Sequence, residues 1–152
     1  MPTEPCPELI RLATAVANLE ETPERILQVE CGAGDGVLFL AREFPSARVR
    51  GIDRNPGAIR AAVARIGLDP EGRVAFKQQA RRSIPYPDDF FDLIVQMDGP
   101  LAVGEIARAL KPGRPIIVSE PGWLTRWRLE RRFKSLASAA TGVYLGCLLS
   151  DE

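Results

Sequence analysis

The residues with the clearest chemical potential lie in a glycine-rich segment near the amino end of the chain. An apolar run at residues 26–30 leads directly into Gly32, Gly34 and Gly36, and a second apolar segment follows. Glycine has no Cβ, so a ligand can lie against its backbone and the turn can adopt unusual dihedral angles. Free N–H groups at the start of the next helix favour a polar or anionic group. These residues predict a cofactor pocket at the end of a first strand, and a glycine-rich turn without a ligand is the alternative.

Asp53 is the second residue with a clear chemical role. It follows a strand-like segment at residues 47–52, whose apolar members are Val49 and Ile52, about 20 residues beyond the glycine turn, where a carboxylate can accept both hydroxyls of a nucleoside ribose. Arg54 beside it would stack on or border the adenine. Alternatively Asp53 caps the helix that begins near Pro56, because aspartate before Asn-Pro also favours a turn.

Composition and charge narrow the class of protein. The chain has 152 residues, 45% of them hydrophobic and 26% charged, which is typical of a single soluble globular domain spanning residues 1–152. The net charge is zero and no histidine is present, so neither nucleic acid nor a histidine base or ligand is expected. The three cysteines lack metal-ligand spacing and no signal peptide is visible, so we expect free thiols, no metal and a cytoplasmic location. No apolar run is long enough to span a membrane.

Strand-like and helix-like segments alternate along the chain. Strands are predicted at 26–30, 47–52, 73–77, 91–96 and 115–119, with a final apolar segment at 143–149. Helices are predicted at 7–21, 35–43, 56–67, 101–110 and from 122 to about 140. This alternation indicates an α/β fold with a doubly wound, mostly parallel sheet.

Four segments, taken together and in order, resemble the class I S-adenosylmethionine (SAM) methyltransferase family. They are residues 26–41 with the glycine turn, 49–53, 84–95 and 109–118. The resemblance covers a core of about residues 24–121, and it implies a Rossmann-like fold, SAM as cofactor and methyl transfer to an acceptor that we expect to be a small molecule. An NAD(P)-linked enzyme would use a similar turn and acid, but the third glycine comes two residues after the second, whereas the dinucleotide fingerprint needs three.

The resemblance also implies a set of cofactor-binding residues: Gln28, Glu30, Cys31, Gly32, Ala33, Gly34, Asp53, Arg54, Gln79, Ala80 and Gln96. Two of them depart from the family pattern, because Gln28 stands where the family has an acid and Glu30 stands where it has a glycine. Glu30 either replaces the missing carboxylate or obstructs SAM. Gln79 and Ala80 stand where an acid often lies near the adenine. These departures also fit a degenerate, non-catalytic member that serves as a binding or assembly subunit.

Candidate catalytic residues are few. Methyl transfer is an in-line displacement that depends mainly on alignment, so a base is not always required. If one is required, Asp98 and Glu120 are the candidates, with Tyr86 a weaker one. Each of the three also fits an ordinary solvated position on a loop.

The segment from residue 122 departs most from the family. Tryptophans at 123 and 127 alternate there with arginines, which predicts an amphipathic helix that packs one face on the sheet and exposes a basic face. A helix that binds a membrane surface or an acidic partner is the alternative. The family ends with a two-stranded hairpin, of which only residues 143–149 are recognisable here. We therefore expect part of the hairpin to be missing and a homodimer to form through the exposed sheet edge or the basic helix, unless the natural chain is longer.

Overall fold

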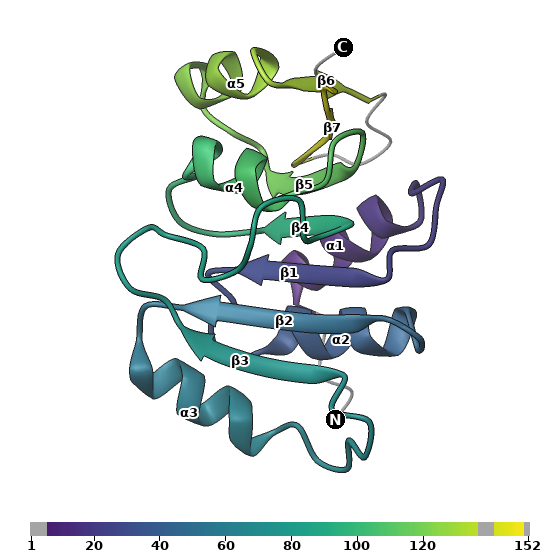
Figure 1. The fold of residues 1–152 in the computed structure, drawn as a ribbon, viewed down its shortest axis with the longest axis vertical. Coiled ribbons are helices and arrows are strands. Elements are labelled where there is room, and N and C mark those ends of the chain that lie inside the picture. Colours follow the sequence, from purple (N-terminus) through teal and green to yellow (C-terminus); the bar gives the residue numbers. More distant parts are fainter. Residues whose placement is uncertain (1–5, 137–141, 151–152) are drawn as a thin grey trace.

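The protein is described by a computed structural model that covers residues 6–136 and 142–150. Within these residues the chain forms a seven-stranded sheet with the order β3-β2-β1-β4-β5-β7-β6 (Figure 1). The parallel strands are β1 (Arg25–Val29), β2 (Arg48–Asp53), β3 (Val74–Gln78), β4 (Leu93–Gln96) and β5 (Pro115–Ser119). β7 (Val143–Leu148) runs antiparallel to β5 and to β6 (Phe133–Ser135). The predicted doubly wound, mostly parallel sheet is confirmed.

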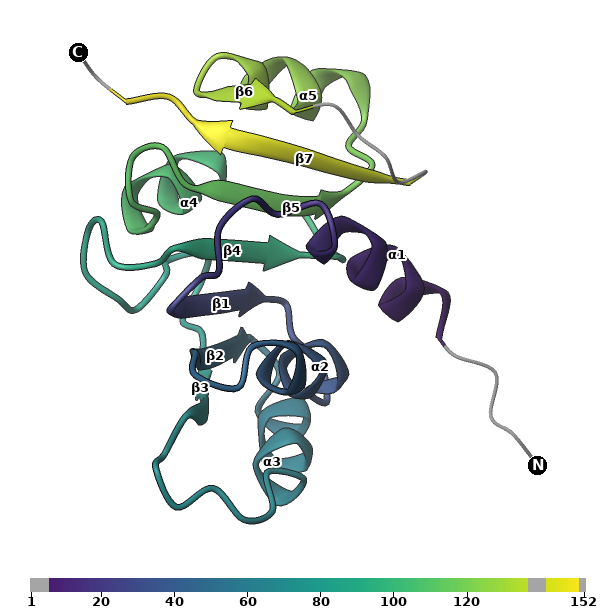
Figure 2. The same ribbon diagram turned by 90° about the vertical axis from the view of Figure 1, so that its right-hand side faces the viewer.

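Helices cover both faces of the sheet, as the front and side views show (Figures 1 and 2). One apolar core joins the sheet to α1 (Pro7–Val16) and α2 (Asp35–Glu43), with α3 (Pro56–Ala64) on the same face. The other core joins it to α4 (Val103–Ala109) and α5 (Trp123–Glu130). Neighbouring residues of one strand point to opposite faces, so Ile26 enters the first core and Leu27 the second. This explains why the central strands read as unbroken apolar runs.

The register of the parallel strands brings the ends of three of them together. Val29 is paired with Ile52, and Gln28 is paired with both Gly51 and Val95. The residues that follow these strands therefore meet at the carboxyl edge of the sheet. α3 starts at this edge because Asn55 Oδ1 accepts a hydrogen bond from Gly57 N at 2.8 Å.

Three helix predictions were too long, and the helix predicted over 56–67 ends at Ala64. The helix predicted over 7–21 ends at Val16, and the one predicted from 122 to about 140 ends at Glu130. Beyond Glu130 the chain turns into β6, whose residue Phe133 is paired with Leu148 of β7 and is buried. Strand pairing and burial of Phe133 stabilise this conformation more than a continued helix would, although the spacing of apolar residues from Trp123 onward is helical. Residues 137–140 of the predicted helix lie outside the described residues.

The expectation of an incomplete C-terminal hairpin is corrected by the same finding. β6 and β7 form an antiparallel pair, with Lys134 opposite Cys147 and Ser135 opposite Gly146. β7 also pairs with β5 from Pro115 to Ser119. β6 therefore supplies the hairpin strand that we expected to be missing beside residues 143–149.

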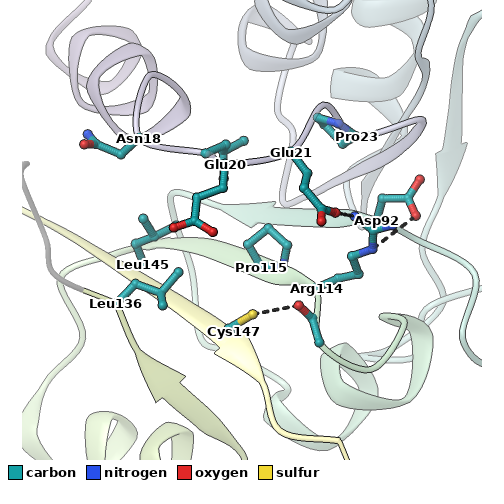
Figure 3. A pocket seen from close by; sticks show the side chains of 12 residues that line it. Asn18, Glu20, Glu21, Pro23, Asp92, Arg114, Pro115, Leu136, Leu145 and Cys147 are labelled. Carbon is teal, nitrogen blue, oxygen red and sulfur yellow. Dashed lines mark hydrogen bonds and ion pairs between the residues drawn. The ribbon is translucent and has the colours of Figure 1, made fainter.

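At the end of the sheet where the parallel strands begin, the buried side chain of Asp92 links three segments of the chain. Its Oδ2 accepts hydrogen bonds from Glu24 N and Arg25 N at 3.0 and 2.9 Å, and Lys111 Nζ donates to Oδ1 at 3.0 Å. Burial opposes ionisation, but these three donors outweigh it and hold the pKa of Asp92 below its usual value. A cavity of about 470 Å³ lies beside this cluster, and Arg114 and Cys147 are among the residues that line it (Figure 3).

Candidate cofactor site at the carboxyl edge of the sheet

The glycine turn opens to space at only one of its three glycines. A Cβ added to Gly32, whose φ is +55°, would meet no atom within 4 Å. A Cβ on Gly34 would lie 2.8 Å from the Phe76 ring, and one on Gly36 would lie 2.3 Å from Gln28 Oε1. The sequence suggested that all three glycines clear room for a ligand. Only the backbone at Gly32 does so, while Gly34 and Gly36 make room for the protein's own side chains.

Asp53 ties the glycine turn to the start of α3. Its Oδ2 accepts a hydrogen bond from Gly32 N and its Oδ1 accepts one from Asn55 N, both at 2.9 Å. The carboxylate is only 8% exposed. Asn55, rather than Asp53, supplies the side-chain cap of α3. Each carboxylate oxygen has a second lone pair that a ribose hydroxyl can use, so the predicted ribose contact is compatible with these bonds and stays a prediction.

Glu30 adopts a backbone conformation that favours glycine. Its φ is +54°, in the left-handed region, which costs a non-glycine residue about 1–2 kcal/mol. The Glu30 carboxylate forms an ion pair with Arg54, with 3.3 Å between Oε1 and Nε. Its Cγ lies 3.1 Å from the position that a Cβ on Gly99 would take. Glu30 thus holds a backbone conformation that suits a glycine, the residue expected from the family pattern, and adds a charged side chain between Arg54 and the loop after β4.

Two hollows flank the Glu30–Arg54 pair. The larger, of about 160 Å³, is bounded by the glycine turn, by Gln28 and Asp98, and by α1 residues such as Leu12. The smaller, of about 10 Å³, is bounded by Arg54, Gln79 and Gln96. Glu30 lines both hollows. The ion pair therefore stands between two parts of one candidate site.

Two buried amide oxygens at this edge have no hydrogen-bond partner among the described residues. They are the Oε1 atoms of Gln28 and Gln79, whose residues are 2% and 5% exposed. Gln79 Nε2 is used, since it donates to Ser83 O at 3.1 Å. Leaving a buried acceptor unpaired is costly, so each oxygen marks a place where a ligand N–H or O–H group would be stabilised. Gln28 lines the larger hollow and Gln79 the smaller one.

The other predicted cofactor residues occupy different environments. Cys31 is buried, and burial together with the nearby Asp53 charge raises the pKa of its thiol to about 12, so it is not a nucleophile at neutral pH. Ala33 is exposed and its carbonyl oxygen accepts from Arg65 Nη1 at 2.9 Å. Ala80 is also exposed. Gln96 is buried, and its Nε2 donates to the carbonyl oxygens of Asp98 and Pro100, which fixes the loop after β4.

The three candidate bases are not brought together. Asp98 is exposed and lines the larger hollow, and its Oδ1 accepts from Gly99 N at 2.8 Å. Glu120 is exposed and pairs with Arg126 at 3.1 Å. Tyr86 packs against Phe90 and Phe91, and burial raises the pKa of its hydroxyl. Among the described residues, neither Glu120 nor Tyr86 lines the two hollows, so the geometry singles out Asp98.

Sequence reasoning missed part of the wall of each hollow. α1 contributes Cys6, Glu8 and Leu9 to the larger hollow, besides Leu12. Arg82, Ile84 and Ile106 come from the loop after β3 and from α4 to line the smaller one. Apart from Ile84, which begins the family-like segment 84–95, none of these residues belongs to a chemical motif. The available signal was the amphipathic pattern of α1, which predicted a packed helix but did not indicate where it packs.

Comparison with known proteins decides the family. A model described as a methyltransferase domain matches residues 26–113, which include the glycine turn, Asp53, Gln79 and Gln96. The chain belongs to the class I SAM-dependent methyltransferase family. The cofactor of this family is SAM, and the open backbone at Gly32 together with the two unpaired amide oxygens fits a ligand that carries donor groups.

Relatives of known function match part of this chain. It is 34% identical over 110 residues to the demethylmenaquinone methyltransferase of Thermus thermophilus, a match that covers 67% of this chain and 49% of the relative. It is 30% identical over 113 residues to the fatty-acid O-methyltransferase of Mycolicibacterium smegmatis, which covers 70% and 39%. The matched region is thus about half the length of these relatives or less.

Solved structures agree with the fold. One chain of the complex between the Haloferax volcanii Trm112 methyltransferase activator and a methyltransferase is 14% identical, with a TM-score of 0.81 over 95% of this chain and 91% of that one. A SAM-dependent methyltransferase from Methanosarcina mazei is 22% identical, with a TM-score of 0.65 over 90% and 97%. The coverage extends beyond the core to the C-terminal strands. Among the described helices, none has the length and apolar character that crossing a membrane needs.

Proposed function

We propose that this chain transfers a methyl group from SAM to a small lipophilic acceptor. The observation that carries the proposal is the pair of buried, unpartnered amide oxygens beside the open backbone of Gly32, in a chain of this family. The relatives named above act on a quinone and on fatty acids, which supports a lipophilic acceptor. A nicotinamide-linked reaction is not favoured, because the family model spans the glycine turn and Asp53.

In this proposal each polar residue of the edge has a defined task. Asp53 accepts the ribose hydroxyls while it holds the Gly32 turn in place. The Oε1 atoms of Gln79 and Gln28 accept hydrogen bonds from the adenine amino group and from the amino group of the methionine end. Bound SAM supplies an electrophilic methyl group on a sulfonium that leaves as a neutral thioether. The protein contributes alignment, which is the main requirement of an in-line displacement.

The Glu30–Arg54 pair has to separate for the cofactor to bind. The two hollows of about 160 and 10 Å³ are smaller than typical cofactor pockets, which occupy about 300–1,000 Å³. The Arg54 side chain is 48% exposed, so breaking this pair costs less than about 1 kcal/mol. Withdrawal of the two side chains would join the hollows into a single groove. Glu30 thereby obstructs the cofactor in the free protein.

Asp98 is the residue best placed to take a proton from the acceptor. It lies at the mouth of the larger hollow on the loop that Gln96 fixes, and its carboxylate is exposed to an entering molecule. The ion pair with Arg126 occupies Glu120, and aromatic contacts surround Tyr86. We therefore assign the role of base to Asp98 for acceptors that must lose a proton.

Transfer of a radiolabelled methyl group tests the proposal. Purified protein is incubated with labelled SAM and either a demethylated menaquinone or a long-chain fatty acid, and the label in the organic phase is counted. We expect transfer to one of them, a loss of at least about tenfold in Asp98→Asn, and no change in the matched control Glu120→Gln. SAM binding without transfer to either probe would contradict a lipophilic acceptor. If SAM does not bind, the chain is a degenerate, non-catalytic family member that serves as a binding or assembly subunit. If NAD(P) raises the melting temperature and SAM does not, the chain is a nicotinamide-linked enzyme.

Assembly and location are also proposals. The homodimer was expected to form through an exposed C-terminal sheet edge or the basic helix, and β6 now lies beside β7 at that edge. The structural neighbour in complex with an activator suggests a protein partner of that kind instead. Sedimentation at several protein concentrations distinguishes a monomer from a homodimer. A cytoplasmic location is inferred from the free cysteines.

A further inference from the structure

The outer face of α5 carries large apolar side chains that nothing in the described structure covers. Trp123 is 83% exposed, Trp127 54% and Leu124 45%. These residues share one side of the helix, because Trp123 and Trp127 are one turn apart, while Leu129 on the other side is buried against the sheet. The predicted packing of the tryptophans on the sheet is therefore wrong. We call Trp123, Leu124 and Trp127, with the flanking Arg128 and Arg131, the α5 face.

The α5 face is strongly basic although the whole chain is neutral. Between residues 120 and 136 there are five basic and two acidic residues, and both acids pair with Arg126. Arg131 lies over the Trp127 ring at 4.8 Å. Arg128, Arg132 and Lys134 form no ion pair with any residue of the described chain. The indole rings are thus bordered by positive charges that no acidic side chain within the described ranges balances.

The α5 face lies at one end of the molecule, on the helix that packs beside β6 (Figure 1). β5 ends at Ser119 and α5 begins at Trp123, so Trp123 lies near the carboxyl edge of the sheet. The candidate cofactor site lies along the same edge. A surface bound by α5 would therefore be close to the side of the sheet at which an acceptor enters.

The shape of the α5 face distinguishes between possible occupants. It is a single two-turn helix, and two tryptophans with one leucine bury about 500 Å² at most, less than the roughly 800 Å² per partner of a stable protein interface. A lipid surface needs no shape complementarity. Indole rings favour the region of the lipid headgroups, and arginines favour anionic lipids. The positive charge and the exposed indole rings thus both match an anionic membrane surface.

We infer that the α5 face binds the surface of an anionic lipid membrane, with the indole rings at the level of the headgroups and the arginines against lipid phosphates. The helix lies along the membrane surface and does not cross it. Binding of this kind requires neither SAM nor methyl transfer, so it is tested separately from the proposed reaction.

Cosedimentation with vesicles and tryptophan fluorescence test this inference together. The two tryptophans of the chain both lie on the α5 face, so its intrinsic emission reports on that face. With phosphatidylglycerol vesicles we expect cosedimentation and a blue shift of the emission, both weakened by added salt. With phosphatidylcholine vesicles we expect neither. Equal binding to both lipids, or no binding to either, would overturn the inference.

Matched variants locate the contact. Trp123→Ser/Trp127→Ser should abolish cosedimentation, and Arg128→Gln/Arg131→Gln should weaken it at least about tenfold. Leu68→Ser and Arg60→Gln, which change exposed residues elsewhere, should bind like the wild type. Unchanged binding in the tryptophan variant would contradict the role of this face. The same blue shift with soluble polyglutamate would assign the face to an acidic protein, and a shift that grows with protein concentration alone would assign it to a second copy.

Discussion

The two ends of the parallel sheet are constructed in opposite ways. At the amino end both carboxylate oxygens of the buried Asp92 accept hydrogen bonds, Oδ2 from two backbone N–H groups and Oδ1 from Lys111 Nζ. At the carboxyl end Gln28 and Gln79 keep unpaired buried oxygens, and Glu30 holds a left-handed backbone. The cavity of about 470 Å³ at the amino end (Figure 3) exceeds both hollows of the carboxyl end in volume, yet none of the described residues that line it has an unpaired buried side-chain polar atom. Unsatisfied buried amide oxygens, rather than volume, therefore mark the candidate site.

The largest effect on stability is expected at the amino end. Asp92→Ala leaves Lys111 and two backbone N–H groups without their acceptor, so the free energy of unfolding should fall by about 2–4 kcal/mol. Urea denaturation measures this change. Asp88→Ala, which removes an exposed partner of Arg108, is the matched control and should cost less than about 1 kcal/mol. If both variants lose the same free energy of unfolding, the buried Asp92 contributes no more than an exposed ion pair, which would contradict this expectation.

The same carboxylate predicts a dependence on pH. The pKa of Asp92 is lower in the folded protein than its value of about 3.9 in the unfolded chain. Its contribution to stability is therefore complete above about pH 4 and is lost as the pH falls through the folded pKa. Urea midpoints from pH 6 down to pH 3 should decline more steeply for the wild type than for Asp92→Ala. Parallel curves would show that other carboxylates dominate acid unfolding.

At the carboxyl end the main effect should fall on binding. Asp53→Ala should weaken the affinity for S-adenosylhomocysteine by a factor that corresponds to about 1–3 kcal/mol, because the ribose hydroxyls lose their acceptor. An analogue that lacks the 3′-hydroxyl separates this from a disturbed Gly32 turn. In the wild type the analogue should bind less tightly than S-adenosylhomocysteine. In Asp53→Ala the two ligands should bind with the same affinity. If Asp53→Ala has unchanged affinity, the ribose binds elsewhere.

Glu30→Gly, also at the carboxyl end, should raise both stability and cofactor affinity instead of lowering them. Glycine adopts the left-handed conformation without strain, so stability should rise by about 1 kcal/mol. Removal of the side chain also takes away the group that lines both hollows and frees Arg54 to move, so S-adenosylhomocysteine should bind more tightly. Glu30→Gln keeps the strain and the bulk but loses the charge of the Arg54 pair, and it should show neither gain in full. Weaker binding by Glu30→Gly would mean that the carboxylate itself holds the cofactor.

The sequence predicts features that depend on neighbours along the chain. β1, β4 and β5 are mostly apolar runs, β2 carries Val49 and Ile52 as its apolar members, and the alternation of these strands with helices indicates the doubly wound sheet. The left-handed backbone at Glu30 is consistent with the family's glycine at this position. β6 was missed because Phe133 is buried by pairing with Leu148, a contact that no local pattern reveals.

The candidate site is less accessible to such reasoning. Gly34 and Gly36 leave room for the side chains of Phe76 on β3 and Gln28 on β1. These contacts exist only once the sheet has formed. Likewise the Glu30–Arg54 pair arises only because β1 and β2 end side by side. The exposure of Trp123 and Trp127 depends on which side of α5 meets the sheet, and Leu129, not the tryptophans, fills that contact.

Isothermal titration with S-adenosylhomocysteine tests the central claim most directly. We predict one site per chain in the wild type, with affinity raised in Glu30→Gly and lowered in Asp53→Ala. This order would place the nucleoside across the Glu30–Arg54 pair at the carboxyl edge. An absence of binding heat at millimolar ligand in both the wild type and Glu30→Gly, in protein that is folded, would contradict the account.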